Sequence, residues 1–268
     1  MKQREQFATK LGFVLAAAGS AIGLGAIWKF PYMAGSNGGS IFIFLFIICM
    51  FLISLPVLIA EFMIGRRGQK DAVTSLKEQA PGTPWYFTGY LGMIMAALIL
   101  SFYSVVGGWI LSYLGRAMTG RLHVERDSFE ALFTSIIQSP VEMVFVQGLF
   151  LFITILIVQA GIKSGIERAS KVMMPLLLIF FIILMIRSLT LDGAFAGVEF
   201  MFVPDWSYLT WETVLLALGQ AFFTLSVGVS VMMTYASYLG REERIGSAGV
   251  TVASMNILIS LMAGLVIF

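Results

Sequence analysis

Charged residues are scarce in this chain of 268 residues, because Asp, Glu, Lys and Arg together make up 12% of it. Soluble domains average about 25%. Apolar residues reach 59%, and the mean hydropathy is +0.92. This composition excludes a water-soluble globular protein and predicts one that crosses a lipid bilayer many times. At roughly 20 residues per helical span, the chain has room for about seven spans joined by short loops.

Cysteine and histidine are nearly absent, since Cys49 and His123 are the only residues of their kind. One cysteine cannot form an internal disulfide, and the two residues together are too few for a His-rich or Cys-rich metal site. A net charge of +2 from scattered basic residues excludes a nucleic-acid partner, which requires a basic surface. Because no nucleophile has a base within helical reach, we also expect no enzyme activity.

Apolar runs between the charged residues predict an all-α polytopic membrane protein. The runs lack the alternation of polar and apolar residues that is typical of the roughly ten-residue strands of a membrane barrel. We expect residues 1–10 to form a cytoplasmic segment, and residues 116–142, which include His123, and residues 191–212 to form outer loops. The seven spans are predicted at residues 11–35, 40–64, 86–115, 143–161, 172–190, 213–239 and 249–268.

A cleavable signal peptide is an alternative interpretation of the first apolar run, because Lys2 and Arg4 precede an Ala-rich stretch. The apolar sequence resumes after Gly19, however, and continues to Tyr32. That length is typical of a span and exceeds that of a signal peptide, so we interpret the run as the first span.

The positions of Lys and Arg predict the orientation of the chain in the membrane. With the N-terminus in the cytoplasm, 12 of the 17 basic residues lie on the inner side. The positive-inside rule therefore predicts a multi-pass protein of the plasma (inner) membrane with a cytoplasmic N-terminus. The inner residues are Lys2, Arg4, Lys10, Arg66, Arg67, Lys70, Lys77, Lys163, Arg168, Lys171, Arg241 and Arg244.

Three glycines, Gly19, Gly23 and Gly25, lie close to the middle of the first predicted span. Gly19 and Gly23 fit the small-xxx-small pattern of close helix packing, which is one interpretation. Three glycines exceed what packing requires, because each costs about 1 kcal/mol of helix propensity. We therefore expect the first span to be unwound at residues 20–25.

The sixth predicted span carries Thr224, Ser226, Gly228 and Ser230 within an apolar helix. Hydroxyls that bond to the preceding helical turn are one interpretation, whereas the glycine among them favours a second break. Unwound backbone at membrane depth is tolerated only where it lines a cavity or a bound ion. In inverted-repeat transporters, half-helix N-termini face substrate anions and freed carbonyls coordinate sodium. The pattern thus predicts a small zwitterionic substrate and a hard cation, bound by carbonyls and by residues such as Thr224 and Asn256.

Glu61 and Lys29 fall within predicted spans, where a charge is costly unless it is paired or hydrated. Glu61 precedes the inner end of the second span, where it either snorkels to the interface or has a functional role. Lys29 lies near the outer end of the first span and is a candidate cationic gate.

At these residues the sequence resembles the neurotransmitter:sodium symporter family, which has the leucine-transporter fold of two inverted repeats. The resemblance extends along the whole chain. It implies that residues 11–190 form the first five-helix repeat and that residues 213–268 form the first two helices of the second. The motifs that carry it are Gly19-Ser-Ala-Ile-Gly-Leu-Gly25, Phe30-Pro31, Asn37-Gly-Gly39, Pro56 through Glu61 to Gly65-Arg66, Lys163-Ser-Gly-Ile-Glu-Arg168, Gln220-Ala-Phe-Phe-Thr-Leu-Ser226 and Thr234-Tyr-Ala-Ser-Tyr238.

The resemblance implies sodium-coupled uptake of a neutral amino acid, in a protein that sits in the lipid bilayer and works by alternating access. Gly23 stands where monoamine carriers have an aspartate, which favours an amino acid as substrate. The implied substrate-binding residues are Ala21, Leu24, Gly25, Ile99, Tyr103, Phe223, Thr224, Ser226 and Val229. The implied sodium ligands are Gly19, Ala21, Ile22, Thr224 and Asn256. The implied gating and support residues are Arg4, Lys29, Glu61 and Tyr238.

Several positions depart from the family pattern. Ala26 replaces an Asn of the first sodium site, and Phe7 replaces a Trp of the inner gate. Lys29 replaces an Arg, which removes bidentate gating geometry. Phe46 replaces a chloride-coordinating Tyr, whereas Ser260 stands where chloride-independent members carry an acid. Chloride is therefore a second candidate ion beside sodium.

Two functional hypotheses follow from the sequence. The first is a sodium symporter for a hydrophobic amino acid, since Ile99, Phe223 and Val229 place no charge in the side-chain pocket. The second is a truncated, transport-incompetent fragment or membrane interaction subunit of the same family. Its basis is that the last predicted span stops at Phe268 without a charged flank, whereas family members continue for further helices.

Overall fold

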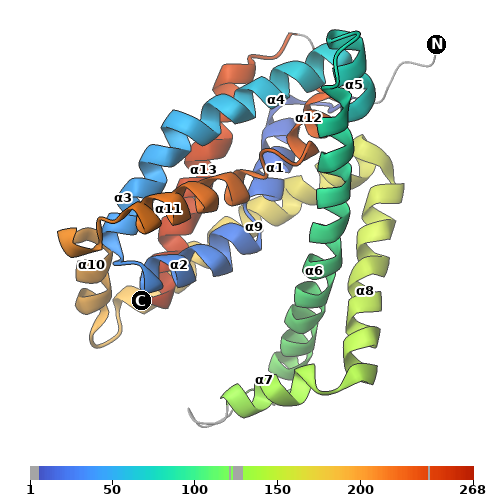
Figure 1. Cartoon of the computed structure of the whole chain (residues 1–268). Coiled ribbons are helices and arrows are strands. Elements are labelled where there is room, and N and C mark those ends of the chain that lie inside the picture. Colours follow the sequence, from blue (N-terminus) through green and yellow to red (C-terminus); the bar gives the residue numbers. More distant parts are fainter. Residues whose placement is uncertain (1–5, 121, 123–128, 241) are drawn as a thin grey trace.

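The computed structural model describes residues 6–120, 122, 129–240 and 242–268, and these residues form helices and no strand (Figure 1). The predicted all-α class is confirmed. The elements are α1 (Lys10–Ala21), η1 (Gly25–Lys29), α2 (Phe30–Ser36), α3 (Ser40–Cys49), η2 (Met50–Ser54), α4 (Leu55–Gly68), α5 (Ala72–Gln79), α6 (Tyr86–Met118), α7 (Phe129–Ile137), α8 (Pro140–Gln159), η4 (Ile162–Glu167), α9 (Arg168–Leu189), α10 (Ala194–Phe202), η5 (Trp206–Tyr208), α11 (Trp211–Leu225), α12 (Val231–Ala236) and α13 (Ile245–Ile267).

Six of the seven predicted spans coincide with helical segments that are long and apolar enough to cross a membrane. Among the described residues, five of these segments are continuous, and α1 forms a sixth with Gly25–Ser36, bent by 51°. The remaining prediction, residues 213–239, falls on α11 and α12, which are interrupted between Leu225 and Val231. The continuous segments are Ser40–Gly68, Tyr86–Met118, Pro140–Gln159, Ile162–Leu189 and Ile245–Ile267.

The fifth span begins earlier than predicted, at Ile162 rather than at residue 172. Charged residues between Lys163 and Lys171 made this stretch look too polar for a span. Two of them, Glu167 and Lys171, form an ion pair at 2.6 Å on successive turns. Pairing within the helix removes the cost that unpaired charges would have there.

The two segments expected as outer loops are partly helical. The segment 116–142 contains α7, with Ile136 fully buried, while His123 lies outside the described residues. The segment 191–212 contains α10 and η5, and Met201 of α10 is 1% exposed. Both helices are short and contain or adjoin acidic residues. Their apolar runs are therefore too short to predict a span.

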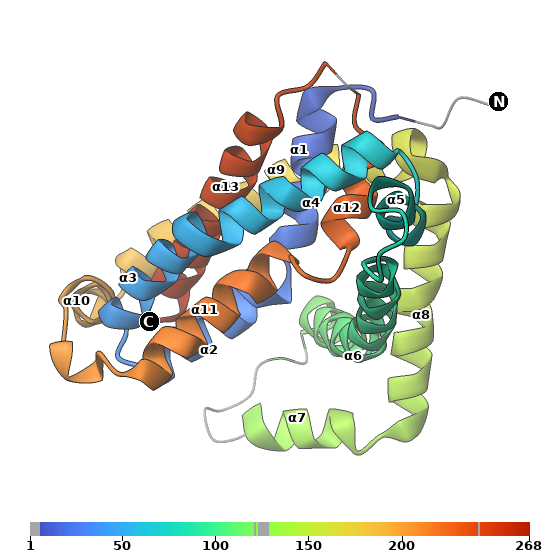
Figure 2. The same ribbon diagram turned by 45° about the horizontal axis from the view of Figure 1, so that its top comes forward.

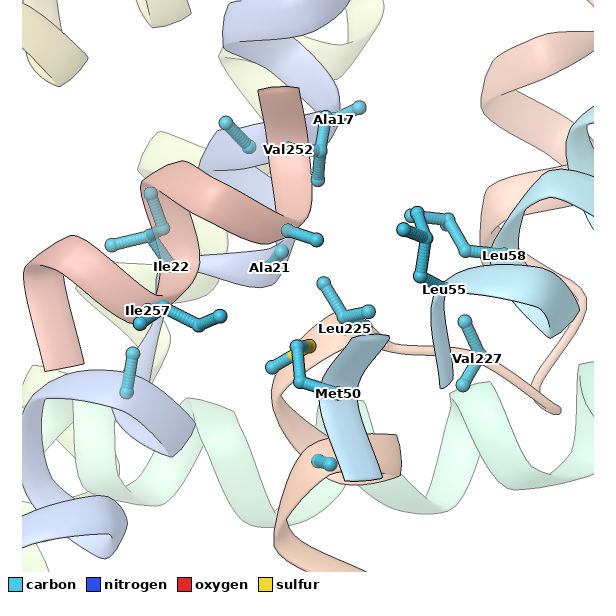
Figure 3. Close-up of a cluster of buried hydrophobic side chains, with 14 of the residues drawn as sticks. Ala17, Ala21, Ile22, Met50, Leu55, Leu58, Leu225, Val227, Val252 and Ile257 are labelled. Carbon is cyan, nitrogen blue, oxygen red and sulfur yellow. The ribbon is translucent and has the colours of Figure 1, made fainter. Parts of the chain in front are cut away.

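The core lies where α1, α4, α11 and α13 meet, and it is built from small and branched apolar side chains (Figure 3). Alanines of α1 allow α13 to approach closely, and Leu225 lies beside Met50 of η2. In a bilayer, helix association of this kind depends on close packing rather than on transfer from water. The labelled residues of the cluster are Ala17, Ala21, Ile22, Met50, Leu55, Leu58, Leu225, Val227, Val252 and Ile257.

Glycine lets α4 and α12 cross in direct backbone contact. A Cβ atom on Gly65 would lie 2.0 Å from the carbonyl oxygen of Met233. No larger residue fits without moving one of the two helices. The crossing fixes α12, and therefore the break that precedes it, against α4.

The α6–α8 hairpin stands beside this core, with α7 lying across its end (Figures 1 and 2). At that end Arg116 of α6 pairs with Glu142 of α8 through two contacts, at 2.6 and 3.1 Å. The Ser112 hydroxyl also donates to Glu142, at 2.5 Å. Near the middle, Gln147 donates to the Ser104 hydroxyl at 2.9 Å. These polar contacts bind the two helices to each other.

Candidate substrate and ion site

The first span is interrupted near its middle, as the glycines predict. α1 ends at Ala21, Ile22 and Gly23 are not helical, and a π-helical turn begins at Gly25. The N–H of Ile22 still bonds to the Ala18 carbonyl at 2.6 Å, so the break is short. The predicted unwinding at residues 20–25 is confirmed over a narrower stretch.

The second break is also confirmed and lies between Leu225 and Val231. Three of its residues have positive φ angles, namely Ser226 at 53°, Gly228 at 83° and Ser230 at 59°. Two of these are not glycine, and such residues adopt the left-handed region only when surrounding contacts hold them. Thr224 instead follows the back-bonding interpretation, since its hydroxyl donates to the Gln220 carbonyl at 2.9 Å.

The two breaks are joined to each other by hydrogen bonds from distant side chains. The Asn256 amide of α13 donates to the carbonyls of Ala21, at 2.9 Å, and Thr224, at 3.4 Å. The Ser226 hydroxyl donates to the Ser20 carbonyl at 3.3 Å. Helix unwinding leaves such carbonyls without intrahelical partners, and here side chains from other parts of the chain satisfy them.

Three side-chain oxygens in this region are buried and have no hydrogen-bond partner among the described residues: Asn256 Oδ1, Gln220 Oε1 and Ser260 Oγ. Gln220 is oriented by its Nε2 group, which donates to the Gly25 carbonyl at 2.7 Å. A buried polar atom without a partner is unfavourable by about 1–3 kcal/mol, so these oxygens are suited to accept a ligand. Neutral oxygens of this kind, with freed backbone carbonyls, form sodium sites in transporters with broken helices.

Two of the implied sodium ligands, Gly19 and Ile22, lie at a cavity that is not lined by Asn256. Gly19 and Ile22 line a cavity of about 680 Å³ between α1, α8 and α9. A Cβ atom on Gly19 would lie 3.2 Å from Met174 Sδ and 3.9 Å from Ser170 Oγ. At the first break, the Ala21 carbonyl thus faces Asn256, whereas Gly19 and Ile22 border this cavity.

One face of α6 runs past both breaks. At Gly92 an added Cβ would lie 3.0 Å from the carbonyl carbon of Val229. Further along, Tyr103 lies 3.8 Å from the Cβ position of Gly23, and its hydroxyl faces the backbone of Gly25. Ile99 is one turn from Tyr103 and two turns from Gly92, which places all three on one helix face. The implied substrate residues of α6 therefore lie along the two breaks.

A cavity of about 370 Å³ lies beside the first break, between η1, α2, α6 and α11. Of the predicted site residues, Leu24, Lys29 and Phe223 line it, whereas Ile99 and Val229 do not. Lys29 Nζ lies 4.3 Å from the centre of the Phe223 ring, within the range of a cation–π interaction. The ammonium group therefore sits at the wall of the cavity, on the ring of a predicted substrate residue.

Glu61 does not snorkel, because it is 3% exposed. Its Oε1 atom accepts a hydrogen bond from the Gly228 N–H at 2.5 Å. Its Oε2 atom is buried with no partner among the described residues. Glu61, a residue of α4, thus stabilises the second break through Gly228. It lies one turn before Gly65, where α4 crosses α12.

At the other end of α1, the chain before the helix contacts the segment that follows α12. The Phe7 N–H donates to the Tyr238 carbonyl at 3.1 Å, and the Phe7 ring packs on Phe13 and Tyr235. Phe7 therefore fills an aromatic cluster there. Arg4, the other residue of the predicted inner gate, lies outside the described residues.

Comparison with known proteins decides the family. A model of the Sodium:neurotransmitter symporter family matches residues 4–130 and 127–268. The chain belongs to this family. The solved structure of MhsT in complex with L-phenylalanine matches with a TM-score of 0.93 and 47% identity, over 99% of this chain and 60% of that chain. The leucine-transporter fold predicted from the motifs is thereby confirmed, and the protein is a transporter-family member rather than an enzyme.

Two relatives within the family are described as sodium-dependent transporters. The YhdH protein of Bacillus subtilis (strain 168) is 51% identical over 264 residues, which cover 98% of this chain and 58% of the relative. A protein of Haemophilus influenzae is 37% identical, over 100% of this chain and 61% of the relative. The chain thus spans less than two thirds of the length of these family members.

Three contacts of the site were missed by the sequence predictions. Gln220 lies within a family motif that predicts no role for its side chain, and Ser20 is predicted only as part of the unwound stretch. Gly92 has no predicted role, although a glycine two turns from Ile99 on the same helix is a signal of close approach. The Ser20 carbonyl could not be assigned to Ser226 from sequence, because the two are 206 residues apart.

Proposed function

We propose that this chain acts in sodium-coupled symport of a neutral, hydrophobic amino acid across the plasma membrane by alternating access. The observation that carries the proposal is the Asn256 amide, which joins both broken helices while its oxygen has no hydrogen-bond partner among the described residues. An amide oxygen in this position, surrounded by carbonyls, is suited to a sodium ion. The description of the relatives as sodium-dependent transporters supports the same ion.

The first sodium ion would be bound by the Ala21 carbonyl, the Thr224 hydroxyl, the Asn256 side-chain oxygen and the carboxylate of the substrate. The hydroxyl would have to turn away from the Gln220 carbonyl to present its oxygen fully. Ala26 is fully buried and has no side-chain oxygen to add. We assign the carbonyls of Gly19 and Ile22, which border the 680 Å³ cavity, to the second sodium ion.

The substrate would lie between α6 and the two breaks. Its carboxylate would meet the amides of Leu24 and Gly25, because these open the outer half-helix, where N–H groups and the helix dipole favour an anion. The Tyr103 hydroxyl, which faces Gly25, would donate to the same carboxylate. The substrate ammonium would be bound by carbonyls of Ala21, Phe223 and Thr224 and by the Ser226 hydroxyl.

The side chain of the substrate would contact Ile99, Phe223 and Val229. None of these residues carries a charge, which favours a hydrophobic amino acid over an acidic or basic one. The complex of the relative MhsT with L-phenylalanine supports this class.

Access from the two sides would be controlled at opposite ends of α1 and α2. Lys29, on the ring of Phe223, would act as the outer gate. Arg4 and Tyr238 would act at the inner gate, and Glu61 would support the second break through its contact with Gly228.

The domain arrangement and orientation belong to the same proposal. Residues 11–190 would form the first five-helix repeat and residues 213–268 the first two helices of the second, since the breaks fall in the first helix of each. The N-terminus would be cytoplasmic, in agreement with the distribution of Lys and Arg.

Chloride is the second ion that the site could accommodate. The Ser260 hydroxyl is fully buried and without a partner among the described residues, so it could donate to an anion. Phe46, also fully buried, supplies no hydroxyl. Replacing chloride by gluconate in the uptake measurement below tests this ion directly.

The proposal is tested by uptake and binding of labelled phenylalanine. With the chain in proteoliposomes, an inward sodium gradient should drive accumulation above a potassium control. In detergent, binding should be saturable and should require sodium. Thr251→Ala on the exposed face of α13, where the hydroxyl bonds only within its own helix, should leave binding unchanged. Absence of sodium-dependent binding for every neutral amino acid tested would sink the proposal.

A further inference from the structure

A third cavity, remote from the substrate site, lies where α4 ends and α5 begins. It has a volume of about 650 Å³ and is lined by Met63, Ile64, Arg66, Arg67 and Gln79. Two apolar side chains and two guanidinium groups thus share one cavity at the end of a membrane span. This combination suits a ligand that has an anionic head and an apolar body.

Arg67 is the cationic group best placed to meet such a ligand. It is exposed, and within the described part of the chain no ion pair involves it. Its neighbour Arg66 donates to the backbone carbonyl of Glu243 at 2.5 Å, and Lys70 pairs with Glu78 across the turn. Of the basic groups between α4 and α5, Arg67 therefore has its guanidinium N–H donors available to a ligand in the cavity.

An apolar stripe leads along the span to Arg67. Leu52, Pro56, Ala60 and Met63 are exposed and follow one another at intervals of three or four residues, and Arg67 comes four residues later. That spacing places them on one face of the helix. The exposed fraction is 71% for Leu52 and 57% for Met63, so the stripe is open to an acyl chain.

The wall of the cavity is held in place by a polar contact between the two helices. Gln79 near the end of α5 donates from Nε2 to the Ile64 carbonyl at 2.9 Å. This bond joins the side chain of Gln79 to the backbone near the end of α4 and fixes α5 beside it. The cavity is therefore part of the folded structure of this end of the molecule.

We propose that this cavity binds the phosphate of an anionic phospholipid, with Arg67 as the main phosphate ligand and Met63 in contact with the acyl chain. A guanidinium group matches phosphate geometry through paired N–H donors. Anionic lipids are enriched in the cytoplasmic leaflet, where they attract basic residues next to a span. With the proposed orientation, that is the leaflet at this end of α4.

The test is native mass spectrometry of the purified chain titrated with phosphatidylglycerol or phosphatidylcholine of the same chain length. We expect phosphatidylglycerol to be retained in preference, and Arg67→Gln to weaken its apparent affinity about fivefold. The matched control is Lys77→Gln, which removes an exposed positive charge from α5 outside the cavity and should change the affinity less than twofold. Circular dichroism and gel filtration check that each variant is folded.

Two further arms separate a lipid from a free phosphate. Inorganic phosphate at millimolar concentration should fail to displace the lipid, and Met63→Gln should weaken phosphatidylglycerol binding because it removes the apolar contact. Equal retention of the two lipids, or an unchanged affinity in Arg67→Gln, would overturn the proposal. Displacement of the lipid by inorganic phosphate alone would overturn it as well, in favour of a phosphate site.

Discussion

The carboxylate of Glu167 accepts a hydrogen bond from the backbone N–H of Ala8 at 2.7 Å, although the two residues are 159 positions apart. Its other oxygen accepts from the Thr9 hydroxyl at 3.2 Å and pairs with Lys171 at 2.6 Å. Gly12 makes this approach feasible, since an added Cβ would lie 2.1 Å from the carboxylate. The segment before α1 is thus tied to the beginning of α9.

Replacing Glu167 with Ala should release this segment. The Ala8 N–H would lose a charge-assisted partner, and Lys171 its counter-ion, which we expect to lower the free energy of unfolding by about 2 kcal/mol. The measurement is the thermal unfolding midpoint, together with the rate of proteolysis before Lys10. Glu199→Gln, an exposed position on α10, is the control. Unchanged proteolysis in Glu167→Ala would mean that the contact does not hold the segment.

Much of the fold could be predicted from the sequence because membrane spans are read from local composition. A run such as residues 40–64 is apolar throughout, and the observed helical segment covers Ser40–Gly68. The breaks were also local signals, since three glycines in one span and a glycine among hydroxyls in another lower helix propensity where they occur. α7 and α10 were missed because a helix of nine residues has no such run.

The contacts that assemble the site could not be predicted in the same way. The family resemblance predicts Asn256 near Ala21 and Thr224. It does not predict that the Asn256 amide N–H donates to both carbonyls, because that depends on how α1, α11 and α13 meet in space. The tie between Glu167 and Ala8 left no pattern in the sequence. A buried carboxylate at the start of a span looks the same, in one sequence, as an exposed one.

Asn256 should be required for sodium dependence. Asn256→Ala removes the amide that bonds to Ala21 and Thr224 along with the free oxygen, and should raise the sodium concentration for half-maximal binding by about tenfold or more. Asn256→Asp keeps a side-chain oxygen but loses the N–H donor to Ala21 and Thr224. Its effect on sodium affinity should therefore differ in size from its effect on stability. Sodium titrations of phenylalanine binding measure the effect. A variant with the sodium response of the unaltered chain would contradict the assignment.

Glu61 should act through its shape and acceptor oxygen more than through its charge. Glu61→Gln retains an oxygen that can accept from Gly228, so it should unfold within a few degrees of the unaltered protein. Glu61→Ala leaves the Gly228 N–H unpaired and a cavity beside it, at a cost of about 3 kcal/mol. Thermal unfolding of the two variants decides the matter, and equal losses would show that the charge itself is needed.

Tyr103 should contribute to substrate affinity through its hydroxyl. Tyr103→Phe preserves the ring that packs on Gly23 and removes the group that faces Gly25. A hydrogen bond to a charged carboxylate is worth about 1.5–3 kcal/mol, so phenylalanine binding should weaken at least tenfold. Tyr90→Phe, exposed on the same helix, should bind normally. Comparable losses in both variants would point to a general effect on α6.

The pair of Arg116 and Glu142 should stabilise the α6–α8 hairpin by a modest amount. Its side chains are 23% and 30% exposed, and the bidentate contact at 2.6 and 3.1 Å is better than that of most surface pairs. A double-mutant cycle with Arg116→Gln and Glu142→Gln should give a coupling free energy of about 1 kcal/mol. The coupling should fall in high salt, since screening weakens a pair that solvent reaches. Additive effects of the two substitutions would instead indicate that each side chain acts through other partners, such as Ser112.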